Sequence, residues 1–272
     1  GLRPLSSLLT LNPINMSKIV LIDADSLLYF EMGKDTLEEA IEGLNNRIQE
    51  ILIKTESDHY IGYLTRGKCF RYDIAKSKPY KYNRKHGSKP PIYYALDAYI
   101  QQDPWNFRSF AGLEADDLVG IARHILDDGC VICSPDKDVL QQLPGKHYNY
   151  QKAEFHETTD DQARDFLWKQ VLMGDSTDGI PGIPGLGPKT ADAIIDNMPD
   201  VLSHHSVVLS QYLAKFRLDE GVSRFYETFK LVRMHTNIDV AEKDVGEIPE
   251  HLFMPTPTPE LITVVNEDDS WE

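Results

Sequence analysis

Acidic side chains gather at four places along this 272-residue chain, each where a strand is expected to end or a helix to begin. They are Asp23 and Asp25; Glu114, Asp116 and Asp117; Asp136 and Asp138; and Asp175 and Asp178. The carboxyl ends of parallel strands converge on one crevice, so we expect these carboxylates to meet there. Without a cation they would repel one another and raise each other's pKa.

The chemistry of these ligands indicates the kind of metal. All-oxygen ligands favour Mg²⁺, with Mn²⁺ as the alternative, over zinc. The carboxylates outnumber the needs of one ion, so we expect two divalent cations about 4 Å apart, as in phosphoryl-transfer sites. Helix capping is the alternative for any single acid, because an aspartate at a helix start satisfies free N–H groups. Four clusters in this order favour the metal site.

A basic strip contrasts with the acidity of the rest of the chain. The net charge is −15, yet residues 68–89 hold eight basic residues and one acid, which gives this strip +7 and leaves −22 elsewhere. Lysine and arginine bind phosphates, and aromatic rings stack on bases of single strands. Tyr80 and Tyr82 are the candidates for stacking, and Lys81 and Arg84 for phosphate contacts and transition-state charge. The alternative is a solvated charge run in a loop.

A glycine-rich turn follows the last acids, from Gly182 to Thr190. It does not fit a nucleotide-triphosphate loop, because Pro188 separates Gly187 from Lys189. We interpret it as a turn between helices whose backbone approaches a DNA phosphate, which glycine permits. A purely structural turn is the alternative.

The elements that must position these groups alternate between strands and helices, which indicates an α/β fold with a parallel sheet. We expect strands at 18–25, 59–64, 130–133 and 146–150. Helices are expected at about 36–55, 91–101, 114–126 and 160–173, with a short one ending at Gln142. Beyond residue 174, helices are expected at 190–197 and about 206–232.

Composition limits the class of protein. Hydrophobic residues make up 41% and charged residues 26% of the chain, which excludes disordered and fibrous classes. No apolar run approaches a membrane span of about 18 residues. Three cysteines cannot form a disulfide framework, and we expect a reducing compartment.

Five motifs in order, from about Lys18 to residue 235, resemble those of the 5′-nuclease superfamily: phage 5′-exonucleases, the 5′-nuclease domain of bacterial DNA polymerase I, and flap endonucleases. The motifs are Ile22-Asp23; Tyr80-Lys81-x-Asn83-Arg84; Gly112-x-Glu114-Ala-Asp116-Asp117; Ser134-Pro-Asp136-Lys-Asp138; and Met173-Gly-Asp175-x-x-Asp178-x-Ile180-x-Gly182 with Gly185-x-Gly187-x-Lys189. The resemblance implies a PIN-like 5′-nuclease fold, with a mostly parallel sheet flanked by helices, a helical arch and a helix–three-turn–helix subdomain.

The resemblance also implies an activity: Mg²⁺-dependent hydrolysis of DNA phosphodiesters at 5′ ends, flaps and junctions, leaving a 5′-phosphate. It assigns Asp23, Glu114, Asp116 and Asp117 to one metal region and the remaining predicted ligands to the other: Asp136, Asp138, Asp175 and Asp178. It makes Lys81 and Arg84 cationic catalysts and stacks Tyr80 on a base. Predicted DNA contacts are Lys78, Tyr82, Asn83, Lys85, Gly182, Gly185, Gly187, Lys189 and Thr190, with a monovalent K⁺ in the turn.

The same resemblance implies partners and a division of the chain. DNA is the expected partner, with an RNA/DNA hybrid as a variant; any polymerase or replisome protein would be a separate chain, and the nuclease a monomer. We expect a flexible extension at 1–15, a nuclease core at 16–173 with the arch at 66–91, a DNA-binding subdomain at 174–240 and an acidic, irregular tail at 241–272. The phage-like pattern suggests a role in replication or recombination, with a cytoplasmic location in a bacterial or phage-infected cell.

One position departs from the family pattern. Thr65 stands where the family usually has an aspartate after the second strand. Either Asp73 supplies the carboxylate from a shifted loop, or the first metal region is one carboxylate short. A junction-binding protein with little or no catalysis is therefore one alternative. A PIN-like ribonuclease is the other, although the Gly182–Lys189 turn is not expected in it.

Overall fold

Four parallel strands form the centre of the sheet in the computed structural model, which describes residues 18–84, 88–199 and 201–259. They are β1 (Ile19–Asp23), β2 (His59–Tyr63), β3 (Cys130–Cys133) and β4 (Gly145–Asn149). Two antiparallel strands, β5 (Glu154–Thr158) and β8 (Thr256–Pro257), complete the order β5-β4-β3-β1-β2-β8. The predicted α/β fold with a mostly parallel sheet is confirmed, and all four predicted strands are present.

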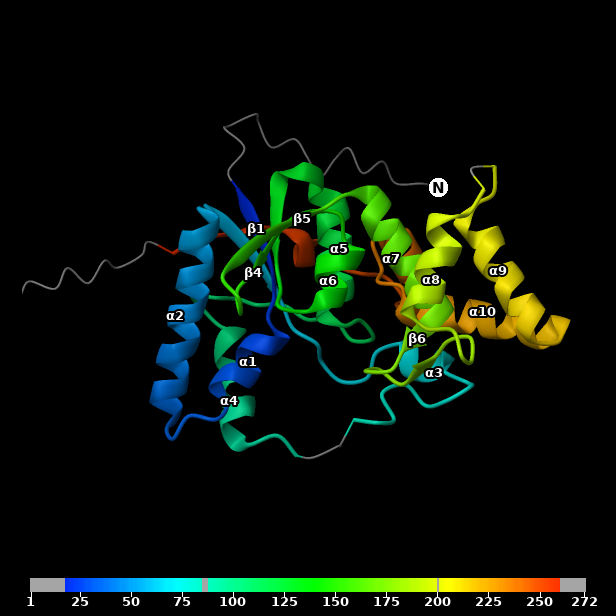
Figure 1. The fold of residues 1–272 in the computed structure, drawn as a ribbon. Coiled ribbons are helices and arrows are strands. Elements are labelled where there is room, and N and C mark those ends of the chain that lie inside the picture. The colour runs from blue at the N-terminus through cyan, green and yellow to red at the C-terminus, as the bar shows by residue number, and fades with distance from the viewer. Residues whose placement is uncertain (1–17, 85–87, 200, 260–272) are drawn as a thin grey trace, which may run out of the picture.

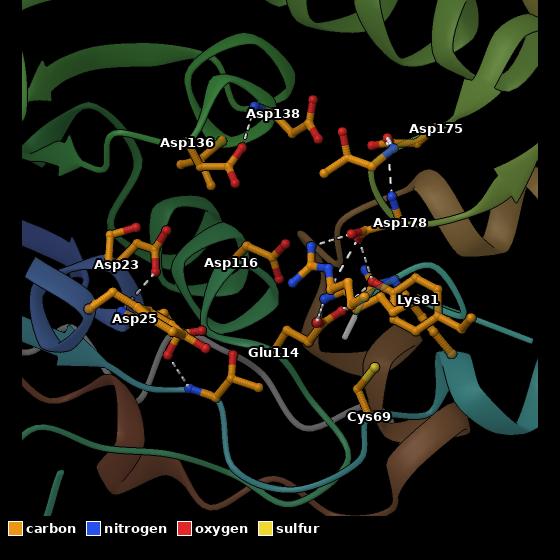
Figure 2. A pocket seen from close by; sticks show the side chains of 18 of the residues that line it. Asp23, Asp25, Cys69, Lys81, Glu114, Asp116, Asp136, Asp138, Asp175 and Asp178 are labelled. Atoms are coloured by element: carbon orange, nitrogen blue, oxygen red, sulfur yellow. Dashed lines mark hydrogen bonds and ion pairs between the residues drawn. The ribbon is translucent and has the colours of Figure 1, made fainter. Parts of the chain in front are cut away.

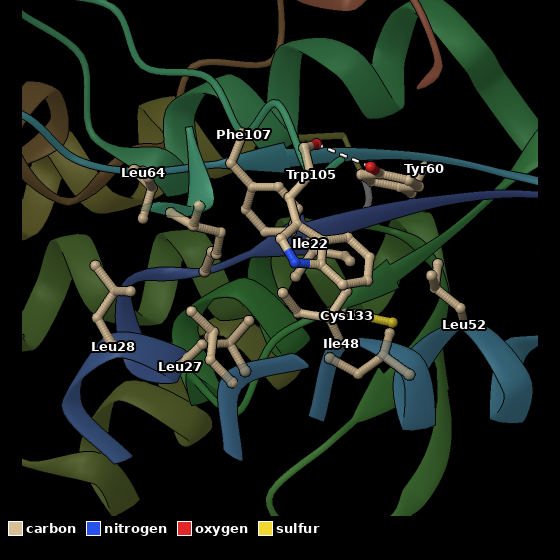
Figure 3. Packing of buried hydrophobic residues seen from close by; sticks show 14 of the residues in the cluster. Ile22, Leu27, Leu28, Ile48, Leu52, Tyr60, Leu64, Trp105, Phe107 and Cys133 are labelled. Carbon is tan, nitrogen blue, oxygen red and sulfur yellow. Dashed lines mark hydrogen bonds between the residues drawn. The ribbon is translucent and has the colours of Figure 1, made fainter. Parts of the chain in front are cut away.

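Helices cover both faces of the sheet because neighbouring residues on its strands point to opposite sides. On one face, Ile22, Tyr60 and Cys133 pack against three helices, α1 (Asp25–Glu31), α2 (Leu37–Thr55) and α4 (Pro91–Ile100). Figure 3 shows Ile48 and Leu52 of α2 meeting Ile22 and Cys133 in this layer. On the other face, Leu21, Ile61 and Ile132 pack against α5 (Ala115–Leu126). Two short elements flank β3: the 3₁₀ turn Asp127–Gly129 and α6 (Lys137–Gln142).

A second, helical part of the chain follows the sheet (Figure 1). Its helices are α7 (Asp160–Met173), α8 (Pro188–Asp196), α9 (His204–Lys215) and α10 (Leu218–Val232). A tight hairpin of β6 (Gly174–Asp175) and β7 (Ile180–Pro181) joins α7 to the turn before α8. The apolar interior of the helical part also contains Cys69 and Tyr80 of the basic strip, so the strip packs against these helices.

Two predicted helical features differ from the structure. The single helix expected at about 206–232 is two helices, because Phe216 and Arg217 adopt extended backbone angles. In the predicted arch, residues 66–84 and 88–90 contain one short helix, α3 (Arg71–Ile74), and are otherwise loop and turn. Proline and glycine punctuate this segment, which opposes a longer helix.

The predicted irregular tail is wrong as far as residue 259. Helix α11 (Ile238–Val245) crosses the expected boundary at 240, and a 3₁₀ turn at Glu250–Phe253 precedes β8. Leu252 and Phe253 are buried in the same layer as α5, and Thr256 pairs with Tyr60 of β2. Buried apolar residues spaced between prolines therefore anchor the tail to the sheet edge. The predicted extension at 1–15 and residues 260–272 lie outside the described residues.

None of the described helices is both long and apolar enough to span a membrane.

Candidate active site

A cleft of about 940 Å³ collects the acidic side chains that the sequence singled out. All the predicted metal ligands except Asp117 line it: Asp23, Glu114, Asp116, Asp136, Asp138, Asp175 and Asp178. Asp25, which was not among the predicted ligands, lines it too. Figure 2 shows these carboxylates directed toward a common space.

Local structure explains how each carboxylate reaches the cleft. Asp23 ends β1, while Glu114 and Asp136 are the residues just before α5 and α6. The capping alternative holds in part, because Asp136 accepts a hydrogen bond from the Asp138 N–H at 2.7 Å and Glu114 takes part in a capping box. The same residues line the cleft, so capping and exposure to the cleft coexist.

Backbone packing in the β6–β7 hairpin presents Asp175 and Asp178. A Cβ atom on Gly174 would lie 2.2 Å from the Ile180 carbonyl oxygen, and one on Gly182 would lie 2.1 Å from the Met173 carbonyl carbon. Only glycine allows two backbones to approach so closely. Gly182 therefore serves this internal contact, whereas the sequence assigned it to DNA binding.

Burial and mutual repulsion raise the pKa of four carboxylates in the cleft. Burial, followed by the charge of Asp25, raises the pKa of Asp23 to about 7. Burial and the neighbouring Asp136 and Asp175 raise the pKa of Asp138 to about 7. Burial likewise raises the pKa of Asp25 and, together with Asp117 and Glu114, that of Asp116. Oxygen ligands destabilised by mutual repulsion fit a hard divalent cation.

Asp117 has a different environment from the other acids. It is fully buried, and its two carboxylate oxygens accept hydrogen bonds from Arg71 at 2.6 and 2.8 Å. The His235 N–H adds a third at 2.9 Å. Burial alone would raise the pKa of Asp117 and of Glu114, but their partners together hold both below the usual range: Arg71 and His235 for Asp117, and Arg71 and Lys81 for Glu114. Although the oxygens of Glu114, Asp116 and Asp117 lie within 4.8 Å of one another, those of Asp117 already have protein partners.

The predicted cationic catalysts contact the carboxylates directly. The Lys81 ammonium donates to Glu114 and lies 3.7 Å from Asp178, while the Arg84 guanidinium pairs with Asp178. Lys81 has a left-handed backbone, with φ of 56°, and its N–H donates to the Asp178 carbonyl at 2.8 Å. These two cations thus occupy one wall of the cleft.

Tyr80 and Tyr82, which the sequence predicts to stack on bases, lie in different environments. The ring of Tyr80 is only 4% exposed and packs edge-on against Tyr72, while its hydroxyl donates to Glu114 and Asp178. A base cannot stack on this buried ring. Tyr82 is 52% exposed, and the Lys78 ammonium lies 5.4 Å from its ring centroid. Of these two tyrosines, Tyr82 is therefore the one whose ring a base can reach.

The remaining predicted DNA contacts lie near the β6–β7 hairpin and the start of α8. Asn83 donates to the Ser176 carbonyl at 2.6 Å, which fastens the basic strip to the hairpin. Lys189 and Thr190 are exposed in the first turn of α8. No described atom lies within 4 Å of a Cβ placed on Gly185 or Gly187, so internal packing does not require glycine at Gly187. Lys85 lies outside the described residues.

A chain of buried amides supports Asp138. Gln170 donates to Asp138 at 3.0 Å, and Gln142 donates to Gln170 at 3.0 Å. The Met234 N–H in turn donates to Gln142 at 2.6 Å. The chain links the end of α10 to a cleft carboxylate, and outer partners of this kind orient metal ligands. No sequence motif indicated Gln142 or Gln170.

The positions of Asp73 and Thr65 decide between the two explanations for the missing aspartate. Asp73 is exposed on α3 and does not line the cleft, so the alternative in which it replaces the missing aspartate is wrong. Thr65 does line the cleft, and its hydroxyl oxygen accepts the Ala115 N–H at 2.9 Å.

The raised carboxylate pKa values predict how stability depends on pH in the absence of metal. Asp23 and Asp138 bind a proton more tightly in the folded protein than in the unfolded chain. The stability that these protons contribute is therefore complete below about pH 4 and is lost as the pH rises through about 7. In EDTA, the thermal unfolding midpoint should therefore be lower at about pH 8 than at about pH 6.

Mg²⁺ should reverse this trend, because it binds the ionised carboxylates of the folded state. Thermal unfolding in EDTA and in Mg²⁺ at both pH values measures the effect. A midpoint in EDTA that rises from the lower to the higher pH would contradict the prediction.

Comparisons with known proteins agree with the motifs. No protein-family model matches the chain. It is 25% identical over 264 residues to the 5′-3′ exonuclease of Bacillus subtilis (strain 168), covering 84% of this chain and 86% of that protein. It is 25% identical to flap endonuclease Xni of Shewanella halifaxensis, covering 82% and 95%. DNA polymerase I of Bacillus subtilis is 29% identical, over 68% of this chain and 24% of the polymerase.

Solved structures share the fold. A T5 protein co-crystallised with metal ions superimposes with a TM-score of 0.65 at 17% identity, covering 84% of this chain and 97% of the other. The bacteriophage T5 flap endonuclease in a complex with DNA and metal ions gives a TM-score of 0.62 at 18% identity, covering 84% and 94%. The chain therefore has the same overall fold as these two proteins.

Proposed function

Since the chain belongs to the 5′-nuclease superfamily and is a nuclease, we propose that it is a Mg²⁺-dependent, structure-selective 5′-nuclease with two metal ions. Its substrates would be DNA with 5′ ends, flaps or junctions, and its product would carry a 5′-phosphate. The observation that carries this proposal is the convergence of carboxylates from four separate elements on one cleft, in contact with the cationic groups of Lys81 and Arg84.

Two groups of carboxylates would hold the metals. Asp23, Glu114 and Asp116 supply the first region. Asp136, Asp138, Asp175 and Asp178 supply the second. Asp136 links the two, since its charge raises the pKa of both Asp23 and Asp138. Bound divalent ions would activate water and stabilise charge on the attacked phosphate.

Lys81 and Arg84 would change partners when substrate binds. Their cationic groups now neutralise Glu114 and Asp178. Metal ions at these carboxylates would compete for the same oxygens and leave both side chains able to contact a phosphate. Positioned cations of this kind stabilise the negative charge that develops in the transition state.

The surface beside the cleft would bind the rest of the DNA. Tyr82 and Lys78 offer an exposed ring and a cation to an unpaired base and its phosphate. At the start of α8, Lys189 and Thr190 accompany a backbone that Gly187 leaves open to close approach. A phosphate there would meet free N–H groups of the first helical turn, and K⁺ would bind in the same turn.

Cleavage of labelled oligonucleotides tests the proposal. The substrates are a 5′-flap DNA, the matching 3′-flap, the blunt duplex and a flap of the same sequence made of RNA, each with Mg²⁺ or EDTA. We expect metal-dependent cleavage of the 5′-flap DNA that releases the flap with a 3′-hydroxyl and leaves a 5′-phosphate on the annealed downstream strand. A 5′-flap that is bound but remains uncut with Mg²⁺ and with Mn²⁺ would favour the junction-binding alternative. Cleavage confined to the RNA flap would favour the ribonuclease.

A further inference from the structure

The rim of the cleft beside β1 and β2 contains a carboxylate and a hydroxyl-bearing residue in contact. Thr65 follows the end of β2, and its N–H donates to the Asp25 Oδ1 at 2.8 Å. The Thr65 hydroxyl accepts the Ala115 N–H at the start of α5, the helix that carries Asp116. These hydrogen bonds fix the Asp25 carboxylate beside the acids of the first metal region.

Asp25 reaches this place from a different element. It is the first residue of α1, two positions after Asp23, and its N–H lies 3.4 Å from the Asp23 carboxylate. Figure 2 shows the Asp25 and Asp23 side chains together at one side of the cleft, near Asp116. The carboxylate that is absent at position 65 is thus present on Asp25, the residue that accepts the Thr65 N–H.

We propose that Asp25 is a metal ligand of the first region and provides the carboxylate that Thr65 does not. The inference rests on the proposed function, because it assumes that this cleft binds divalent cations. Thr65 acts as a positioning residue: its N–H holds one oxygen of Asp25, while its hydroxyl holds the start of α5. The second carboxylate oxygen of Asp25 would bind the cation.

Neither helix capping nor ion pairing explains why the Asp25 carboxylate lies in the cleft. The residue before α1 is Ala24, and no side chain caps this helix. The nearby Lys89 ammonium lies 3.6 Å from the Tyr93 ring centroid and 4.8 Å from that of Tyr29, so these two rings hold it. An acid in the first turn does favour the helix dipole, but this effect does not require the acid to enter a cleft that already holds Asp23 and Asp116.

Direct measurement of metal binding tests the proposal without reference to cleavage. Mn²⁺ is titrated into metal-free protein and free Mn²⁺ is followed by electron paramagnetic resonance. Asp25→Asn keeps an oxygen for the Thr65 N–H but removes the negative charge. It should weaken Mn²⁺ binding by about tenfold or more, because changing even a residue that only supports a metal ligand lowers metal affinity by about that factor. Asp35→Asn, the same change on an exposed acid before α2, should bind like the wild type.

A double variant guards against a folding artefact. Asp25→Asn/Thr65→Asp returns a carboxylate to the same rim and should bind Mn²⁺ more tightly than Asp25→Asn alone. Thermal unfolding in EDTA monitors the fold; the single variant removes a charge that repels Asp23, so its midpoint should not fall. If the midpoint does fall, recovery of Mn²⁺ affinity in the double variant still supports the proposal, and failure to recover overturns it.

The outcomes separate this inference from the proposed function. If Asp25→Asn binds Mn²⁺ like the wild type while Asp136→Asn/Asp138→Asn binds it weakly, Asp25 is not a ligand and the metal centre stands. If the wild type binds no Mn²⁺, both this inference and the metal-dependent function are overturned.

Discussion

Replacing Asp136 and Asp138 together by asparagine should abolish cleavage of 5′-flap DNA while leaving DNA binding intact. Both residues line the cleft, and Asp138 lies near both Asp136 and Asp175. Removing two charges from the second metal region would forfeit several kcal/mol of transition-state stabilisation, so kcat/KM should fall at least about a thousandfold. Single-turnover cleavage with Mg²⁺ and a filter-binding assay in EDTA measure the two effects.

The direction of the binding change distinguishes this result from unfolding. Without metal, the two carboxylates repel the phosphates of bound DNA, so the double variant should bind DNA in EDTA at least as tightly as the wild type. Asp160→Asn/Asp161→Asn is the matched control, because these exposed acids at the start of α7 carry the same charge and lie outside the cleft lining. A double variant at 136 and 138 that still cleaves at the control's rate would contradict the assignment.

Replacing Arg71 by methionine should strongly destabilise the folded protein. The guanidinium is almost fully buried and donates to Asp117, Glu114 and two backbone carbonyl groups, those of Leu231 and Arg233. Its removal leaves the buried Asp117 carboxylate without a counter-charge, whereas Glu114 keeps Lys81. Breaking a buried pair in this way costs about 3–5 kcal/mol of the free energy of unfolding. Urea unfolding in EDTA measures the loss.

Two further variants show whether the buried pair is the cause. Arg164→Met removes an arginine whose ion pair with Asp161 is exposed on α7, and it should cost no more than about 1 kcal/mol. Arg71→Met/Asp117→Leu removes both partners, and it should recover part of the loss because no unpaired Asp117 carboxylate remains. A loss in Arg71→Met as small as that in Arg164→Met would contradict the role assigned to Arg71.

The sequence alone was sufficient for the sheet and for the assembly of the cleft. Continuous apolar runs such as Ile19–Ile22 predict buried parallel strands, and all four predicted strands pair in parallel. Parallel strands and the helices that follow them bring their ends to one edge, so acids at those ends converge whatever the details of packing. For this reason the predicted ligands at Asp23, Asp116 and Asp138 line one cleft.

Contacts between distant segments could not be predicted in this way. The strip at 68–84 is basic in sequence, but Arg71 turns inward to Asp117, and Lys81 and Arg84 turn to Glu114 and Asp178. Composition gives the charge of a segment, and only packing decides which oxygen each cation meets. Tyr80 is buried and Tyr82 exposed for the same reason, although the two lie two positions apart.

Tertiary structure also determined two features that the sequence left open or predicted wrongly: the residues after 240 and the carboxylate missing at position 65. The residues after 240 have the composition of a solvated tail, yet Leu252 and Phe253 find an apolar face beside β2 and draw β8 into the sheet. Thr65 stands where a carboxylate is expected, and Asp25, 40 positions earlier in the chain, accepts a hydrogen bond from the Thr65 N–H. Local sequence determines which elements form and where their ends lie. The free energy of each side chain depends on neighbours brought together by folding, so its partner, its pKa and its role belong to the tertiary structure.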